Sequence, residues 1–374
     1  MTGEERFLAA LRLEQPDVVP TFTKGMSPQA IVGVARILTS DADDLDIDLM
    51  SPLPEEDNAR LMELFMLIHE ELDIDGYSNR DVGVMYWGLG MEIVDDLRMR
   101  DGWGVVYQRN PHGIPVPMSH PVERLSDLER LPPAASVGPP PASVRSGAQR
   151  FKGRKALVGD VLGPFTGSWF LRGHAELLAD FVLDPELVHA LMRYVTDSGR
   201  AKLEAAVDTG MQMVTLNDDI AHKDNPFMSP RHYREFVAPY HRELVAFGKE
   251  LGLIMVLHCD GNLWPLLDEI IDCGFEGLHP LQPDAGMDLG RLKESVGDRL
   301  CLIGNLSVTE VLPNGSTDEV EAAVIAAIEA AAPHGGYILS DSNVIDPGVK
   351  AENFITMMRA AKRYGRYAEE RVAQ

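Results

Sequence analysis

Short apolar runs alternate with longer amphipathic segments along most of the chain. We expect strands in the apolar runs at residues 17–23, 74–78, 156–161, 213–218, 254–258, 277–281, 300–305 and 337–341. Amphipathic segments such as 185–207, 230–251 and 317–332 predict helices between those strands. Repeated strand–helix alternation over this length predicts one α/β domain, a single (β/α)8 barrel of the TIM type that spans residues 1–374.

Two segments fall outside this alternation. The opening pattern E-R-F-L-A-A-L-R-L predicts an N-terminal helical extension that ends before Gln15-Pro16. Residues 81–110 look like an insertion, which we expect to form a small hairpin near the barrel mouth. The Pro-rich stretch 131–144 is not expected to divide the chain, because too few strands precede it to build a separate domain.

Composition and charge limit which classes of partner and which cellular location are expected for this protein. The chain has 58 acidic against 34 basic residues, a net charge of −24, which disfavours nucleic acid or an anionic membrane as the main partner. No apolar run approaches the roughly 20 residues that span a bilayer, and the N-terminus does not resemble a secretory signal. The three cysteines give no paired disulfide framework, which favours a cytoplasmic location, and none forms a Cys-x-x-Cys, which disfavours a closed structural zinc site. No Gly-rich phosphate loop follows a strand, so no nucleotide cofactor is expected.

Polar residues follow several predicted strands, where barrel enzymes place their chemistry. The consecutive carboxylates Asp218 and Asp219 are candidates for proton transfer, because two neighbouring carboxylates raise the pKa of one of them. The alternative is that one caps the next loop and the other is solvated. His258 and Asp260 should project together into the mouth, since alternate residues of a strand share a face, and Cys259 should point away. Candidate substrate contacts are Lys24, Trp169, Asn217, His279, Gln282 and Asn305. Core packing for Trp169 and His279, turn formation for Asn305 and solvation for Lys24 remain the alternatives.

Several motifs occur in an order and spacing that resemble a known family. They are E-R-F-L-A-A-L…P-D-V-V-P, D-G-W-G-V-V-Y, G-D-V-L-G-P-F-T-G-S-W, F-M-S-P-R-H-Y-R-E-F, V-L-H-C-D-G-N, I-G-N-L-S and G-G-Y-I-L-S-D-S-N. Together they resemble the uroporphyrinogen decarboxylase superfamily over nearly the whole chain. The resemblance implies a (β/α)8 barrel with substrate at the carboxyl ends of the strands, and a homodimer. True decarboxylases of this superfamily carry Arg-Gln-Ala-Gly-Arg after the first strand, whereas this chain has F-T-K-G-M-S-P-Q, which disfavours a substrate with many carboxylates.

The zinc methyltransferases of the superfamily carry His-x-Cys at the strand end and a later cysteine. Here Asp260 takes the place of the first cysteine and S-D-S-N, with Asp341, stands near the second. The resemblance therefore implies His258, Asp260 and Asp341 as ligands of a zinc ion that is harder and more Lewis-acidic than a thiolate-bound one. Such an ion suits a methyltransferase or O-demethylase that takes the methyl group of a small O-methyl substrate. The acceptor would be a separate corrinoid protein or another carrier.

Two other functions stay open at this stage. A metal-free decarboxylase of a small acid would use Asp219 and His258 as acid–base groups and Lys24 to hold a carboxylate. A non-catalytic binding protein on the same barrel would use His258 and Asp260 only to hydrogen-bond its ligand. Measuring bound zinc distinguishes the methyltransferase from both.

Overall fold

The core of the computed structural model is a sheet of eight parallel strands, in the order β1-β12-β11-β10-β9-β8-β7-β2. The structure describes residues 1–45, 55–78, 91–109, 115–136, 138 and 142–367. The strands are β1 (Thr21–Phe22), β2 (Gly76–Ser78), β7 (Ala156–Leu162), β8 (Met213–Asn217), β9 (Ile254–His258), β10 (Gly277–His279), β11 (Cys301–Leu306) and β12 (Tyr337–Asp341). Each of the eight strands predicted from the apolar runs is present, which confirms the (β/α)8 barrel.

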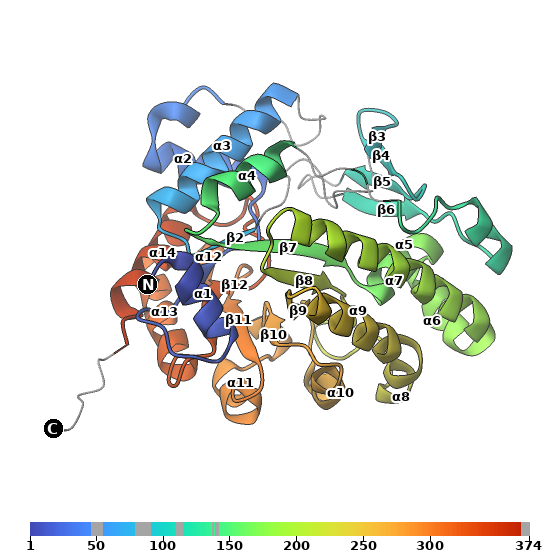
Figure 1. Cartoon of the computed structure of the whole chain (residues 1–374). Coiled ribbons are helices and arrows are strands. Elements are labelled where there is room, and N and C mark those ends of the chain that lie inside the picture. Colours follow the sequence, from blue (N-terminus) through green and yellow to red (C-terminus); the bar gives the residue numbers. More distant parts are fainter. Residues whose placement is uncertain (46–54, 79–90, 110–114, 137, 139–141, 368–374) are drawn as a thin grey trace.

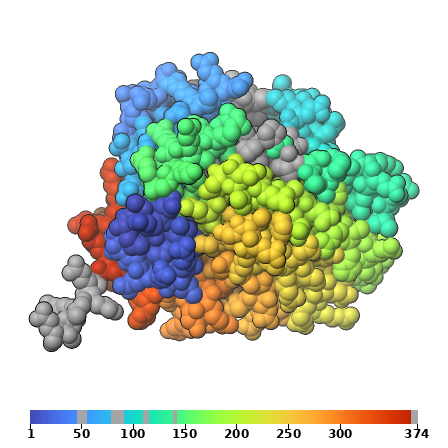
Figure 2. Space-filling model, viewed as in Figure 1, coloured from blue at the N-terminus to red at the C-terminus, as the bar shows by residue number. Residues whose placement is uncertain are grey.

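The sheet curls so that the first and last parts of the chain meet. β1 pairs with β12 in parallel, and Asp75, just before β2, donates its backbone N–H to the carbonyl of Thr21 at 3.1 Å. Figure 2 accordingly shows the blue N-terminal segment packed beside the orange and red C-terminal elements. We call the end where the strands finish the mouth, and the opposite end the N-terminal face.

Helices surround the strands on the outside (Figure 1). They are α2 (Pro28–Leu38), α3 (Glu55–Glu71), α4 (Ala142–Phe151), α5 (Pro164–Arg172), α6 (His174–Leu183), α7 (Pro185–Asp208), α8 (Pro230–His232), α9 (Ala238–Glu250), α10 (Leu267–Asp272), α11 (Leu289–Val296), α12 (Val311–Asn314), α13 (Thr317–Ala331) and α14 (Ala351–Tyr364). Within the described part of the chain, no helix is both long enough and apolar enough to span a membrane.

The N-terminal extension closes the barrel from below. Helix α1 (Gly3–Leu11) begins with a capping box in which Thr2 and Glu5 satisfy each other's backbone N–H groups. Its buried Phe7, Ala10 and Leu11 pack with Phe22 and with strand residues that point inward. This small interior core is separate from the larger core between the sheet and the helices.

The insertion after β2 is larger than the predicted hairpin. It forms an antiparallel sheet of β3 (Met91–Ile93), β4 (Arg98–Asp101), β5 (Val106–Arg109) and β6 (Pro115–Ser119). Residues 81–90 and 110 of the predicted segment lie outside the described residues. Buried Asp101 holds the turn between β4 and β5, because its carboxylate accepts hydrogen bonds from the backbone of Trp103 and Val105 and from the Tyr107 hydroxyl.

The helix predicted over 230–251 is interrupted. A π-helical turn at Tyr233–Val237 separates α8 from α9. Pro239 explains the break, because it lacks the N–H that a regular helix would donate to the carbonyl of Glu235.

Candidate active site at the barrel mouth

Three neighbouring strands bring polar side chains to one level of the mouth. Asn217 at the end of β8 is in register with His258 at the end of β9, and His258 is in register with His279 at the end of β10. Partners in adjacent parallel strands project to the same face, so these side chains share one wall of the barrel. Asp219 and Asp260 follow two residues after the strand ends.

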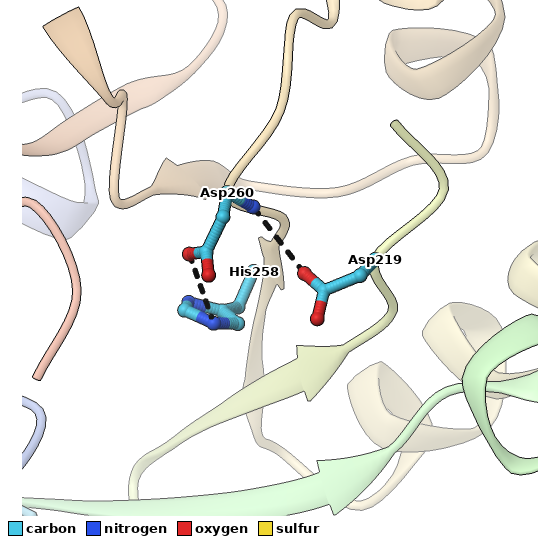
Figure 3. Close-up of side chains that lie close together, drawn as sticks. All are labelled: Asp219, His258 and Asp260. Atoms are coloured by element: carbon cyan, nitrogen blue, oxygen red, sulfur yellow. Dashed lines mark hydrogen bonds and ion pairs between the residues drawn. The ribbon is translucent and has the colours of Figure 1, made fainter. Parts of the chain in front are cut away.

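Asp219, His258 and Asp260 form a group of possible metal ligands (Figure 3). One donor atom from each lies within 4.8 Å of the other two. His258 Nε2 lies 3.5 Å from Asp260 Oδ1, and the Asp260 backbone N–H donates to Asp219 Oδ1 at 3.3 Å. The predicted common orientation of His258 and Asp260 is thus confirmed. We refer to these residues as the three-residue group.

Cys259 points away from this group, as the strand alternation predicted. Its side chain is 1% exposed and belongs to the core between the sheet and the helices. Burial, and secondarily the charge of Asp219, raises the pKa of the Cys259 thiol well above its ordinary value. The thiol is therefore neutral and faces the wrong side to bind an ion in the mouth.

The two carboxylates of the group are electrostatically strained. Burial, followed by the nearby charge of Asp219, raises the pKa of Asp260 to about 7. Solvent reaches 33% of the Asp260 side chain, but its Oδ1 atom is inaccessible and has no hydrogen-bond partner among the described residues. Burial also raises the pKa of Asp219, against the opposing effect of Lys24. A bound cation would relieve both carboxylates.

Asp218 is turned toward a helix and away from the mouth. Its carboxylate accepts hydrogen bonds from the backbone N–H groups of Phe165 at 3.2 Å and Thr166 at 2.6 Å, in the first turn of α5. Its Oδ2 also lies 2.7 Å from Nε2 of His241, and both side chains are fully buried. The strand approaches α5 so closely that a Cβ on Gly163 would lie 2.2 Å from the Asp218 Cβ. The predicted pair Asp218–Asp219 is therefore divided between α5 and the mouth.

His241 completes a buried charged pair with Asp218. Burial alone would lower the pKa of His241. The hydrogen bonds and charges of Asp218 and Cys273 outweigh burial and raise that pKa to about 9. The other ring nitrogen, Nδ1, lies 3.0 Å from the Tyr233 hydroxyl. This arrangement fixes the start of α5 and, through it, the end of β8.

Lys24 sits inside the mouth with 4% of its surface exposed. Its ammonium donates a hydrogen bond to Asn217 Oδ1 and lies 3.7 Å from Asp160 Oδ1. Asn217 in turn donates to Asp160 at 3.1 Å. The predicted substrate contacts Lys24 and Asn217 are thus brought together, with Asp160 of β7 as a partner that the sequence analysis did not single out.

Asp341 is buried apart from the three-residue group. Its side chain is fully buried, and neither carboxylate oxygen has a well-formed hydrogen bond among the described residues, although the Thr23 side chain and the Asn343 backbone N–H lie close to it. Burial raises the pKa of Asp341 to about 7, against smaller opposing effects of Thr23 and Lys24. Of the three predicted ligands, the structure brings His258 and Asp260 together with Asp219, and Asp341 lies outside their group.

The remaining predicted contacts are largely occupied by the protein itself. Asn305 donates its side-chain amide to the carbonyls of Leu281 at 2.6 Å and Met287 at 2.9 Å, which holds the loop after β10. Half-buried Trp169 lies within α5, where it meets the ring of Phe170 edge-on. Gln282 begins the short turn Pro283–Ala285. His279 is 1% exposed, and its ring lies against the ring of His258.

Asn343 is a site residue that sequence reasoning missed. Its amide donates to Asp260 Oδ2 at 2.6 Å, so it orients one member of the three-residue group. Asp160, on β7, was missed as well, although a single acid within an apolar strand was a usable signal. Asn343 gave no comparable signal, because its contact joins positions 83 residues apart.

Comparison with known proteins agrees with this architecture. The family model described as "Uroporphyrinogen decarboxylase (URO-D)" matches residues 96–364. The chain belongs to the URO-D family. The match covers β4 to β6 of the insertion, the strands from β7 to β12 and every member of the three-residue group. It confirms the family resemblance of the sequence motifs.

Both methyltransferases and decarboxylases are found among the URO-D relatives. A "Methylcobamide:CoM methyltransferase MtaA" of Methanosarcina barkeri is 27% identical over 208 residues, 56% of this chain and 58% of that relative. A "Uroporphyrinogen decarboxylase" of Aromatoleum aromaticum is 31% identical over 166 residues, 42% of each chain. A solved "methyltransferase from Methanosarcina mazei" superposes with a TM-score of 0.70 at 22% identity, covering 97% of this chain and 99% of that one. The structure confirms the fold, and the relatives confirm that this is an enzyme family.

Proposed function

We propose that this URO-D family member is a methyltransferase that takes the methyl group of a small O-methyl substrate and passes it to a corrinoid protein or another carrier. The observation that carries the proposal is the three-residue group Asp219, His258 and Asp260 in the mouth. Relatives named methylcobamide:CoM methyltransferases support the general reaction. The oxygen-rich donor set supports the choice of an O-methyl substrate.

The donor set fits a divalent ion such as zinc. Two carboxylates and one imidazole are ordinary zinc ligands, and catalytic zinc sites with three protein ligands keep a fourth position open. The raised pKa values of Asp219 and Asp260, and the buried Oδ1 of Asp260 that lacks a hydrogen bond among the described residues, mark a place where a cation is favoured. When bound there, the ion would supply Lewis acidity toward a substrate oxygen.

The surrounding residues would hold the group and orient the substrate. Asn343 fixes Asp260, and the backbone of Asp260 fixes Asp219. Lys24 and Asn217 form a polar wall that can contact a substrate oxygen. In the reaction, the O–CH3 bond breaks, the methyl group joins the cobalt of a reduced corrinoid that supplies the electron pair, and the substrate oxygen keeps its own pair and takes up a proton. Of the consecutive carboxylates Asp218 and Asp219, which were predicted to transfer protons, Asp219 is the one that faces the mouth.

Zinc binding by purified protein tests the proposal first. We expect about one tightly bound zinc in the wild type and a loss of more than about 100-fold in affinity for His258→Ala and for Asp219→Asn. His222→Ala is the matched control, because His222 is an exposed histidine in the loop after β8 that lies outside the three-residue group. Formation of methylcobalamin from cob(I)alamin and methoxylated aromatic compounds would then measure turnover.

Each outcome of the zinc-binding and turnover experiments supports one of the three candidate functions. Zinc lost only in the group variants, together with methylcobalamin formation, supports the methyltransferase. No zinc in the wild type would overturn it in favour of a metal-free decarboxylase, for which Asp219, His258 and Lys24 remain the candidate groups. Ligand binding without turnover would support a binding protein. We retain the expectations of a homodimer and a cytoplasmic location, to be tested by light scattering and cell fractionation.

A further inference from the structure

The ring of His258, a member of the three-residue group, lies against the ring of His279. His258 on β9 and His279 on β10 are register partners, and their Nδ1 atoms are 2.7 Å apart. The ring centroids are 4.9 Å apart with an interplanar angle of 29°. Both side chains are buried, with 6% and 1% of their surface exposed. The two rings are therefore shielded from solvent, His279 more completely than His258.

The short distance between the two Nδ1 atoms requires a proton between them. Two bare ring nitrogens repel each other, and two N–H groups would clash, so one ring donates and the other accepts. When both rings are neutral, the tautomer of one histidine therefore determines the tautomer of the other. The ring that donates from Nδ1 has a bare Nε2, and the ring that accepts carries its proton on Nε2.

The surroundings of the two Nε2 atoms differ. His258 Nε2 lies 3.5 Å from Asp260 Oδ1, within the three-residue group. His279 Nε2 is buried and has no hydrogen-bond partner in the described part of the chain. The His279 ring instead meets the ring of Phe22 edge-on, at 5.9 Å between centroids and 72° between planes.

We propose that His279 is a positioning residue that sets the tautomer of His258 for metal binding, which rests on the metal site of the proposed function. With a divalent ion bound, His258 donates from Nδ1 to His279 and presents a bare Nε2 to the ion. The proton of His279 then resides on its Nε2, beside Phe22. Without the ion the order is reversed, and His258 carries its proton on Nε2, which faces Asp260 Oδ1 at 3.5 Å. Metal binding is thereby accompanied by a coupled tautomer exchange within the pair.

The acceptor of the histidine proton is unusual in its chemistry. Metal-bound histidines commonly donate their second N–H to a carboxylate or a backbone carbonyl, which makes the bound imidazole more basic. A neutral imidazole is a weaker acceptor than a carboxylate, so His258 would remain a poorer electron donor to the ion. The ion would keep more of its Lewis acidity, which suits activation of an ether oxygen.

Substitution of His279 tests the proposal. His279→Phe removes the acceptor and keeps a ring in the buried site, and we expect zinc affinity to fall by about 10–100-fold. His279→Gln offers a side-chain carbonyl as acceptor, and we expect it to restore most of the affinity. His69→Gln is the matched control for buried histidines, because His69 is fully buried on α3 and hydrogen-bonded to its own helix. Unfolding in urea identifies variants that fail to fold.

Nitrogen NMR of wild-type histidine side chains tests the same proposal without any variant. We expect His258 to carry its proton on Nε2 in the zinc-free protein and on Nδ1 in the zinc-loaded protein, with the opposite exchange in His279. Unchanged zinc affinity in His279→Phe, or zinc coordinated by Nδ1 of His258, would overturn this inference and leave the metal site intact. A wild type that binds no zinc would overturn the proposed function and this inference together.

Discussion

Both ends of the barrel bury a carboxylate completely, but they treat it in opposite ways. At the N-terminal face, Asp75 accepts from Arg6 at 2.5 Å, from Lys362 at 2.7 Å and from the backbone of Thr21 at 2.9 Å. At the mouth, Asp341 has no ion pair and no well-formed hydrogen bond among the described residues, and only the Thr23 side chain and the Asn343 backbone N–H lie close to its carboxylate. The first carboxylate is matched by cations from α1 and α14 and ties the ends of the chain together. The second remains unmatched.

The same contrast extends to the neighbours of each carboxylate. Asp160, Asp219, Asp260 and Asp341 lie around the mouth, and Lys24 is the cation that the structure places among them. An uncompensated buried acid destabilises a fold, so such a group persists where a ligand or ion uses it. We infer that the ion pairs at the N-terminal face stabilise the barrel, whereas the carboxylates at the mouth serve to bind an ion or a ligand.

The largest expected effect is at the N-terminal face. Asp75→Ala should lower the free energy of unfolding by about 3–5 kcal/mol, because it removes a fully buried carboxylate and leaves the partly buried Arg6 and Lys362 without their shared partner. Urea denaturation measures the loss. Asp73→Ala is the control, since Asp73 also pairs with Lys362 but has 74% of its side chain exposed, and should cost less than about 1 kcal/mol. Equal losses in the two variants would contradict the distinction between the two ends.

At the mouth, removing a carboxylate should have the opposite sign. The pKa of Asp341 rises from 3.8 to about 7 on folding. Its raised value means that stability is greatest below the unfolded pKa and falls as the pH rises toward the folded pKa. Asp341→Asn removes this cost and should stabilise the protein at pH 8 by at most about 4 kcal/mol, since one pKa unit corresponds to about 1.4 kcal/mol.

Urea denaturation at several pH values checks this prediction. The difference between Asp341→Asn and the wild type should grow between about pH 4 and pH 7 and then level off. A difference that does not change with pH would show that Asp341 is matched by a partner after all, and the contrast with Asp75 would fail.

A smaller effect is expected where α5 meets the end of β8. The Thr166 hydroxyl accepts a hydrogen bond from the backbone N–H of Asp219 at 2.9 Å. Thr166→Val keeps the shape but leaves that buried N–H unsatisfied, at a cost of about 1–2 kcal/mol in stability. We also expect about 10-fold weaker zinc binding, because Asp219 loses its orientation. Thr166→Ser retains the hydroxyl and should preserve affinity, and isothermal titration of zinc compares the variants.

Local periodicity predicted much of the fold and part of the site. The apolar runs predicted the strands, and alternation along β9 predicted that His258 and Asp260 face the mouth while Cys259 faces the core. Which of the consecutive acids Asp218 and Asp219 faces the mouth could not be predicted. That choice depends on α5 and on His241, which lie more than 20 residues away in the chain.

Contacts between distant segments also bear on two other predicted roles. Asn305 was predicted as a substrate contact, and the structure shows its amide hydrogen-bonded to the carbonyls of Leu281 and Met287 in the loop after β10. Asp341 was assigned to the metal by its place near the last strand, yet the geometry of the mouth brings Asp219 to the group instead. Contacts between distant segments decide these roles, and periodicity along one segment carries no information about them.

The smallest expected effect separates core from site within a single strand end. Cys259→Ala removes one buried sulfur between His258 and Asp260 in sequence, and should lower the free energy of unfolding by about 1 kcal/mol. Zinc affinity should not change, because the thiol is neutral and packs in the core on the far side of the strand. Parallel urea and zinc titrations measure both quantities. Weaker zinc binding in Cys259→Ala would mean that the strand end turns over on loading, and that a thiolate joins the ion after all.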